Sequence, residues 1–402
     1  MPSATTDPRM KSRAAPRRRV RLSWSDPVLR GIVWQVLIVG AVIGIIWYLV
    51  DNTNRNLAAR RIATGWGFLD RVAGIPIGES LIPYDPAVHT YGRALIVGIL
   101  NTLRVSVIGI VLATFLGTFI GIGRLSKNWL VARISAVYVE TMRDVPLLLH
   151  LLFWYTLMQQ LPGPRQAMRI GDSVFLSNRG VGVPVIHWEP AHSWAFLAFV
   201  GGLVVVCVLN GIARRRQEAT GLRPRVWPAA LALLVALPVL VWAAFGAPFA
   251  VERPVMRGFN FQGGATLSPE YAALLIGLVI YTAGFVAEIV RSGIQAVPTG
   301  QWEAARAVGL HAGTILRKIV LPQAMRVIIP PMTSQYLNIT KNSSLAVAIG
   351  YQDVVSIANT TLNQTGQAIE GIAYIMAVYL TISLSISLFM NWYNARIALK
   401  ER

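Results

Sequence analysis

Six polar or ionisable side chains lie inside long apolar runs of this sequence, or close to their ends, and they are its main candidates for chemistry. They are Gln335, Asn338, Lys341, Asn342, Glu288 and Arg104. Amide, ammonium, guanidinium and carboxylate groups can hydrogen-bond a small polar solute. No Ser, His or Asp combination suggests a catalytic set, so these groups favour a solute path over an active site.

The residues from Gln335 to Asn342 have spacings that can share one face of a helix. Pro330 and Pro331 precede them, and prolines in a helix leave backbone carbonyls free for a pore to use. Such a face could offer acceptors to an ammonium group and donors to a carboxylate. It could equally hydrogen-bond neighbouring helices and serve packing, and both interpretations stay open.

Arg104 and Glu288 carry charges that would cost about 2.5–3.5 kcal/mol each at the centre of a bilayer. One of them could line a solute path. Both fall near the ends of their apolar runs, where a side chain can reach water or pair locally. We favour this second interpretation.

Several familiar kinds of site are missing from the sequence. It contains neither a His-Glu-x-x-His zinc pattern nor a Gly-x4-Gly-Lys-Ser/Thr phosphate loop. Its one cysteine, Cys207, rules out a disulfide framework within the chain. We therefore expect no enzyme activity, no metal and no cofactor, and any ATP hydrolysis must come from a separate partner.

The composition indicates that lipid is the solvent. Of the 402 residues, 54% are hydrophobic and 14% are charged, whereas soluble domains carry about a quarter charged residues. The net charge of +19 comes mainly from short basic segments between apolar runs. That distribution argues against a nucleic-acid partner and favours membrane lipids.

Eight stretches are long and apolar enough to cross a hydrocarbon core about 30 Å thick. They cover residues 31–50, 95–123, 144–161, 194–212, 227–245, 271–290, 323–345 and 372–392. The first is expected to be a retained anchor, because a cleaved signal peptide would have a shorter apolar core and a small-residue cleavage site. The stretch 323–345 is the weakest, since two prolines and a lysine interrupt it.

The distribution of Lys and Arg predicts the orientation, because cytoplasmic loops carry the excess of these residues. With the N-terminus inside, 24 of the 37 basic residues fall in inner segments and 10 in outer ones. Both termini are then cytoplasmic, and segments 51–93 and 161–193 lie outside.

The inner segment from Gln301 to Met325 is the most informative part of the chain. Its first part, 302–308, has helix-forming residues, and Gly309 then permits a sharp backbone turn. A second short helix is expected from Thr314, ending before or at Pro322 because proline interrupts a helix. The segment should form a compact knob, although an amphipathic loop lying on the membrane surface is an alternative.

The knob resembles the motif of ATP-binding-cassette importer permeases, Glu-Ala-Ala-x3-Gly-x9-Ile-x-Leu-Pro. The matching residues are Glu303, Ala304, Ala305, Gly309, Ile319, Leu321 and Pro322. In that family the knob docks into a groove on the ATPase. The resemblance implies that these residues couple the chain to an ATP-binding subunit on the cytoplasmic face.

Further segments are similar to the polar amino acid permeases of this family. They are Arg143–His150, Ala287–Ile294, Pro298–Ala305, Leu321–Ala324 with Pro330-Pro331, and Lys341–Leu345. The larger layout, with the opening Gly92–Arg104, resembles the general L-amino acid permeases. This implies a permease subunit of an ATP-driven importer for L-amino acids with broad specificity, in the bacterial inner membrane.

The expected fold is an all-α polytopic membrane protein with a five-helix type I importer core. Its order would be a basic cytoplasmic tail at 1–30, an anchor helix at 31–50, a periplasmic segment at 51–93, core at 94–160, an insertion with two extra helices at 161–267, and core again at 268–395 with the coupling loop 301–325.

The resemblance also implies a second permease subunit or homologous copy and a periplasmic amino-acid-binding protein. The alternative, an ion-gradient-driven secondary transporter, would be expected to show paired halves with related broken helices. No such duplication is evident in the sequence.

The predicted orientation can be tested with introduced cysteines. Ser173→Cys should react with an impermeant thiol reagent in intact cells, and Thr314→Cys should not, because only the first lies in an outer segment. Labelling in the reverse order would contradict the orientation.

Overall fold

The computed structural model describes residues 27–59, 64–171, 173–222, 224–257 and 260–397. The chain divides into two compact units, Met1–Thr64 and Gly65–Arg402. In the first, α1 (Pro27–Ala59) extends the predicted anchor 31–50 in both directions, and most of its described side chains are exposed. Nearly all of the predicted basic tail 1–30 lies outside the described residues.

In the second unit, helices occupy the other seven predicted spans. The α-helices described in this unit are α2 (Tyr91–Arg124), α3 (Trp129–Asp144), α4 (Leu147–Gln159), α5 (Pro190–Thr220), α6 (Trp227–Leu231), α7 (Leu237–Ala244), α8 (Pro269–Gln295), α9 (Thr299–Ala307), α10 (Ala312–Ile315), α11 (Leu321–Asn342), α12 (Val354–Thr365) and α13 (Ala368–Ile397). A π-helical segment, Ala232–Ala236, joins α6 to α7.

Six of the described helical stretches are long and apolar enough to cross a membrane by length and composition. They are α1, α2, α5, the continuous α6–α7 helix, α8 and α13. The helix α4 is shorter, with 13 residues, and α11 contains Pro330 and Pro331. Both pack against α8, so they belong to the same bundle.

The region predicted as one span at 144–161 contains a break. The helix α3 ends at Asp144, and Val145 and Pro146 have extended backbone before α4 begins at Leu147. Proline disfavours helical backbone in the residue before it, which explains the break. Helical structure here begins at Trp129, well before the predicted start. The helices α3 and α4 both pack on α8.

Short strands occupy the two segments that flank α5–α7. They are β1 (Met168–Ile170), β2 (Val174–Ser177), β3 (Gly180–Val183), β4 (Val185–Ile186), β5 (Val251–Glu252), β6 (Val255–Arg257), β7 (Asn260–Gln262) and β8 (Ala265–Leu267). The antiparallel sheet has the order β1-β2-β3-β8, and β4–β5 and β6–β7 form separate pairs.

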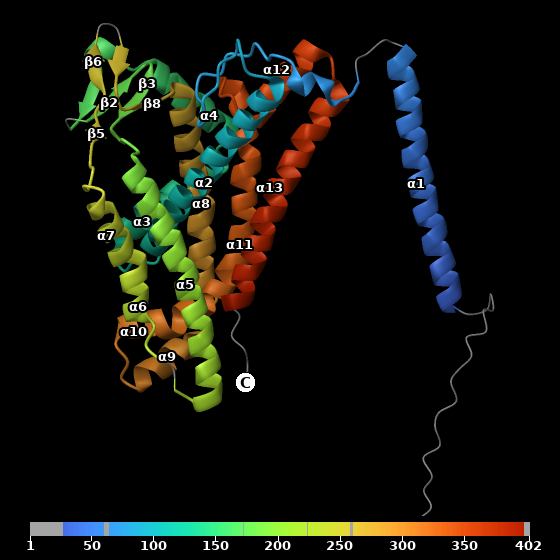
Figure 1. The fold of residues 1–402 in the computed structure, drawn as a ribbon. Coiled ribbons are helices and arrows are strands. Elements are labelled where there is room, and N and C mark those ends of the chain that lie inside the picture. The colour runs from blue at the N-terminus through green and yellow to red at the C-terminus, as the bar shows by residue number, and fades with distance from the viewer. Residues whose placement is uncertain (1–26, 60–63, 172, 223, 258–259, 398–402) are drawn as a thin grey trace, which may run out of the picture. The chain divides into compact units, whose positions relative to one another are not determined.

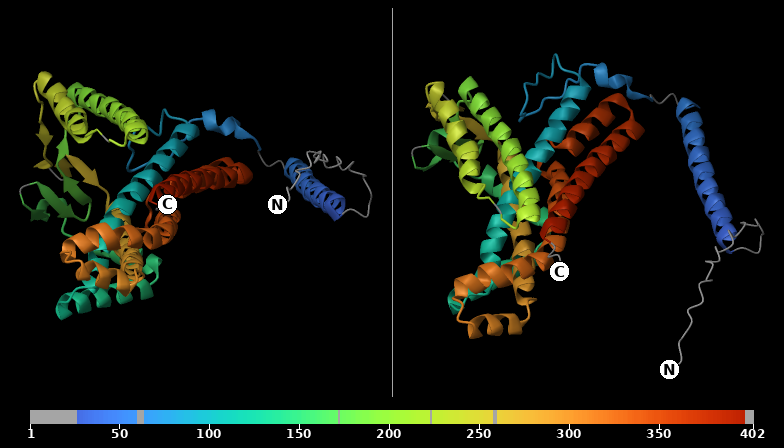
Figure 2. Two further views of the ribbon diagram at one scale, coloured as in Figure 1. Left: turned by 90° about the horizontal axis from the view of Figure 1, so that it is seen from below. Right: turned by 60° about the horizontal axis from the view of Figure 1, so that its bottom comes forward.

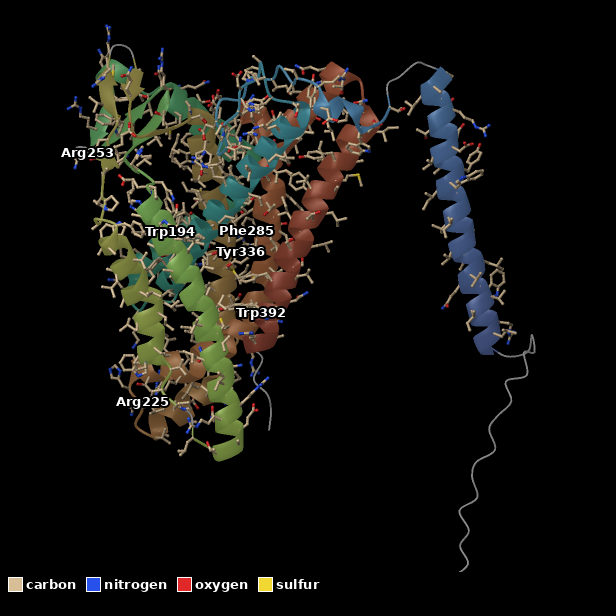
Figure 3. All side chains as sticks on the ribbon, viewed as in Figure 1. Trp194, Arg225, Arg253, Phe285, Tyr336 and Trp392 are labelled. Atoms are coloured by element: carbon tan, nitrogen blue, oxygen red, sulfur yellow. The ribbon has the colours of Figure 1, made fainter. Side chains whose placement is uncertain are left out.

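The pairing of β3 with β8 joins the two ends of the insertion. Val181 lies opposite Leu267 in the register, and β8 leads directly into α8. Arg253 and Arg225 lie at opposite ends of the inserted helices (Figure 3). The sheet therefore fixes the outgoing and returning chain at one end of the bundle.

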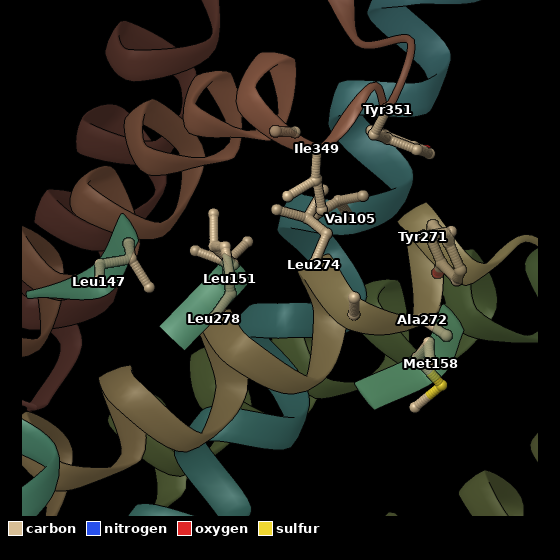
Figure 4. Close-up of a cluster of buried hydrophobic side chains, with 12 residues drawn as sticks. Val105, Leu147, Leu151, Met158, Tyr271, Ala272, Leu274, Leu278, Ile349 and Tyr351 are labelled. Atoms are coloured by element: carbon tan, nitrogen blue, oxygen red, sulfur yellow. The ribbon is translucent and has the colours of Figure 1, made fainter. Parts of the chain in front are cut away.

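The strands and α12 lie at one end of the second unit, here called the strand end, and α9 and α10 lie at the other, the knob end (Figures 1 and 2). Between them, a buried cluster joins α2, α4 and α8 with the segment after α11 (Figure 4). Leu151, Leu274 and Leu278 are completely buried or nearly so. Apolar burial thus centres on α8.

The helices α2 and α8 approach each other closely. A Cβ atom at Gly117 would lie 2.5 Å from the Val286 Cβ, and one at Gly121 would lie 2.6 Å from the Ala287 carbonyl oxygen. Small residues four apart let two helix backbones approach closely. Glycine is required at these positions because no side chain fits.

This contact makes Gly117 sensitive to substitution. Gly117→Leu should destabilise the protein by about 1–3 kcal/mol, because the new side chain overlaps Val286 and overpacks the contact. The measurement is the thermal unfolding midpoint of the purified protein. Gly201→Leu on α5 is the matched control, since a Cβ there has open space. Equal midpoints for the two variants would contradict the tight contact.

Candidate functional site

The knob is built from α9, a turn and α10. Gly309 has a φ of +75°, the left-handed region that L side chains rarely adopt. Its backbone N–H donates to the Arg306 carbonyl at 2.9 Å, and that of Leu310 donates to the Ala305 carbonyl at 3.1 Å. A Cβ at Gly309 would have free space. The backbone angle, and not crowding, therefore favours glycine here.

The second half of the knob differs from the prediction of a helix that ends at Pro322. After α10, a π-helical segment covers Leu316–Val320, and the helix continues into α11 without a break. Pro322 falls in the first turn of α11. The wider π turn directly before Pro322 accommodates a residue that has no N–H to donate. The knob therefore joins α11 through continuous helix.

One face of the knob is buried and the other is exposed. Ala305, Ile315 and Val320 pack into a cluster with residues at the end of α8 and the start of α11. Glu303 and Ala304 are exposed, as are the larger apolar side chains of Val308 and Leu316. Among the motif residues, Ile319 and Pro322 are half-buried and Leu321 is exposed. The knob is thus held on two long helices and presents a mixed polar and apolar face.

The four candidate residues on α11 form a polar face without partners. Asn338 and Lys341 are exposed, and Gln335 and Asn342 are half-buried. No hydrogen bond or ion pair found among the described residues involves any of these four side chains. Their side chains are free to interact with a solute or another subunit.

Arg104 lies apart from that face, near the strand end. Its Nη1 is 2.6 Å from Oε2 of Glu79, and its guanidinium carbon is 4.1 Å from the centroid of the Tyr271 ring. Glu79 precedes α2 and was not recognised as a candidate in the sequence. No local pattern pairs it with a residue 25 positions later.

Glu288 lies near the knob end and joins α8 to α2. Its Oε2 is 2.5 Å from Nη1 of Arg124, and its Oε1 is 2.5 Å from Nη2 of Arg291. Arg124 also lies 3.9 Å from the Glu140 carboxylate on α3. The six candidates thus occupy three separate places: the α11 face and one ion pair toward each end of the α2–α8 pair.

Asp353 is a fully buried carboxylate at the strand end that the sequence analysis also missed. Its Oδ1 accepts the Ser356 N–H at 2.9 Å and caps α12, and its Oδ2 accepts the Tyr379 hydroxyl at 3.4 Å. Burial raises the pKa of Asp353 to about 6. An aspartate directly before a helical run is an N-cap signal, which could have identified this role.

The chain is similar to proteins of one kind along nearly all of its length. Residues 226–399 match the family described as binding-protein-dependent transport system inner membrane component. The putative amino-acid ABC transporter permease protein YhdX of Escherichia coli is 52% identical, over 95% of this chain and 97% of the relative.

Two further relatives cover the same extent. The general L-amino acid transport system permease protein AapQ of Rhizobium johnstonii is 48% identical, over 95% of this chain and 96% of the relative. The glutamate/glutamine/aspartate/asparagine transport system permease protein BztB of Rhodobacter capsulatus is 42% identical, over 94% and 96%. The likeness therefore includes the anchor and the insertion.

Asp353 makes the stability of the strand end depend on pH. Its folded pKa of about 6 lies above the ordinary value of 3.8, so between these values only the folded state keeps the proton. The free energy of unfolding therefore falls as the pH rises from about 4 to about 6, by about 3 kcal/mol in total.

Asp353→Asn keeps an acceptor for the Ser356 N–H but does not titrate. The unfolding midpoint of this variant should rise relative to that of the unsubstituted protein between pH 4 and pH 7. Asp70→Asn, at an exposed carboxylate, is the control and should show no such trend. A midpoint difference that is the same at both pH values would contradict the raised pKa.

Proposed function

The chain belongs to the family of ABC transporter permeases, the inner membrane components of binding-protein-dependent transport systems, and we propose that it carries several kinds of L-amino acid inward. The observation that carries this proposal is the 48% identity, over nearly the whole of both chains, to a general L-amino acid permease. A further relative is named for four different amino acids. The spans of this chain hold few charges, as expected for a path that tolerates different side chains.

The proposed orientation puts the knob end in the cytoplasm together with both termini. The excess of Lys and Arg in the inner segments supports it. The strand end then faces the periplasm, where a secreted amino-acid-binding protein would deliver cargo.

The knob is the proposed contact with an ATP-binding subunit. The exposed Glu303 offers a charge to that partner, Ala304 allows close approach, and Val308 and Leu316 add apolar area. The buried face of the knob packs on α8 and α11. A push on the exposed face would therefore move both helices.

The polar face of α11 is the proposed wall of the amino acid path. Exposed Asn338 and Lys341 without partners would be costly against lipid tails, so the face should be covered in the membrane. A second permease subunit, or another copy of this chain, would cover it and leave a polar path between the two. Amide and ammonium groups there can pair with the carboxylate and ammonium groups that all amino acids share.

The role of the knob can be tested by disturbing its turn at Gly309 or by reversing its charge at Glu303. Gly309→Val should abolish uptake because valine resists the φ of +75°. Glu303→Lys should also abolish it by reversing an exposed charge. Both proteins should still reach the membrane, as checked by immunoblotting. Gly201→Val on α5 is the control and should transport normally. Near-normal uptake in both knob variants would make the docking role untenable.

The proposed path can be tested with a panel of labelled L-amino acids. Asn338→Leu should lower uptake of every transported amino acid by a similar factor, because the side chain would meet the shared backbone groups. Asn338→Gln keeps the amide and should retain more uptake. A loss confined to one amino acid would refute the shared path, and a complex that moved only a sugar, a metal ion or a peptide would refute the substrate class.

A further inference from the structure

Glu79 joins α2 and the start of α8 at the strand end. Its carboxylate accepts the backbone N–H of Ser268, directly before α8, and pairs with Arg104 of α2 at 2.6 Å. Its backbone carbonyl accepts a hydrogen bond from Nδ2 of Asn101 at 2.9 Å. A single residue of the segment before α2 thus holds α2 and α8 together.

The neighbouring residues fasten the same segment to the link between α11 and α12. The backbone N–H of Gly78 donates to Oε1 of Gln352 at 2.7 Å, and Nε2 of Gln352 donates to the Pro76 carbonyl at 2.6 Å. Nδ2 of Asn101 also donates to the Gln352 carbonyl, at 2.9 Å. Residues 76–79 with Gln352 are called the clasp below. In Figure 1 the segment before α2 runs beside α12 at the strand end.

The clasp leaves little room between the helix ends that it joins. The cavity among Glu79, Asn101, Glu270 and Gln352 has a volume of about 90 Å³. The helix ends therefore lie close together at the clasp.

The clasp can hold firmly and still be released. The side chains of Arg104 and Glu79 are 19% and 12% exposed, so their attraction is only weakly screened by water. The other links are single hydrogen bonds, each with a modest net contribution of about 0.5–1.5 kcal/mol because water can replace it. Polar links of this kind can break and re-form, because water can take the place of each partner.

We infer that Glu79 holds the outer end of the transport core closed through the clasp, and that the clasp must release in each cycle for an amino acid to enter. The inference rests on the proposed function, which supplies the cargo and the outward orientation of the strand end. Glu79 is a positioning residue here, since it acts through α2, α8 and Gln352. A merely structural role would require the clasp to stay shut.

A reversible cross-link distinguishes the proposed release of the clasp from a merely structural role. Gly78→Cys with Gln352→Cys, in a Cys207→Ser background, places two thiols where a Cβ at Gly78 lies 3.8 Å from Oε1 of Gln352. A short, reducible bis-thiol reagent then joins them in the assembled transporter. Uptake of labelled amino acid should fall at least tenfold on cross-linking and return on reduction. Unchanged uptake with the lock complete would overturn the clasp.

A second variant weakens the clasp instead of cross-linking it. Glu79→Gln keeps an acceptor for the Ser268 N–H but removes the charge that holds Arg104. ATP hydrolysis by the complex without amino acid should rise severalfold, because the closed state is weakened. Asp70→Asn removes a charge from an exposed side chain in the same outer region and should leave hydrolysis unchanged. Equal basal rates for both variants would count against the clasp.

The unsubstituted complex in the same assay distinguishes the clasp from the proposed function. If it takes up no amino acid, the proposed function fails. If it takes up amino acid and the locked variant does so equally, only the clasp fails.

Discussion

The close contact between α2 and α8 is the constraint on which the rest of the second unit depends. Gly117 and Gly121 bring the two backbones so near that no side chain fits between them. Toward the knob end, Glu288 of α8 forms an ion pair with Arg124 of α2. Toward the strand end, Glu79 pairs with Arg104 of α2 and accepts the Ser268 N–H directly before α8. The two helices are therefore held together by packing around Gly117 and by polar links toward both ends, of which the proposed release of the clasp breaks only those at the strand end.

The paired helices α2 and α8 link the knob end to the strand end. The helix α8 leads into the knob at one end, and its first residues meet the clasp at the other. The knob also continues into α11, which carries the unpartnered polar face. A displacement of the knob would thus reach the proposed path through α11 and the clasp through α8. Within the described residues, α8 and α11 are sufficient to carry such a displacement from the knob to the clasp and to the proposed path.

The elements that could be predicted are those whose signal is local. An apolar run of membrane length can hardly be anything but a helix in lipid, and helices occupy all eight predicted spans. The turn at Gly309 follows from one residue that tolerates a positive φ. By contrast, the strands depend on pairs such as Val181 with Leu267, whose partners are far apart in the chain. The sequence of a short segment does not show which distant segment it pairs with.

The same reasoning explains what the sequence could not show at the candidate site. Pro322 was expected to end a helix, but its effect depends on whether it falls in an interior turn or in a first turn, which the preceding π segment decides. For Arg104 the sequence favoured local pairing, and the structure shows such a pair, but the partner Glu79 could not be named because it lies outside any span and shows no local spacing to Arg104. Charges in a membrane protein cannot be assigned roles until their partners are known.

We propose that ATP hydrolysis by a partner, transmitted through the knob, drives this chain. The most direct test is uptake of labelled L-amino acids into proteoliposomes that contain the chain with its ATP-binding subunit, second permease and binding protein. Uptake should require ATP on the knob side and should persist when ionophores remove all ion gradients. Uptake by the permease alone that follows an ion gradient and ignores ATP would contradict the account.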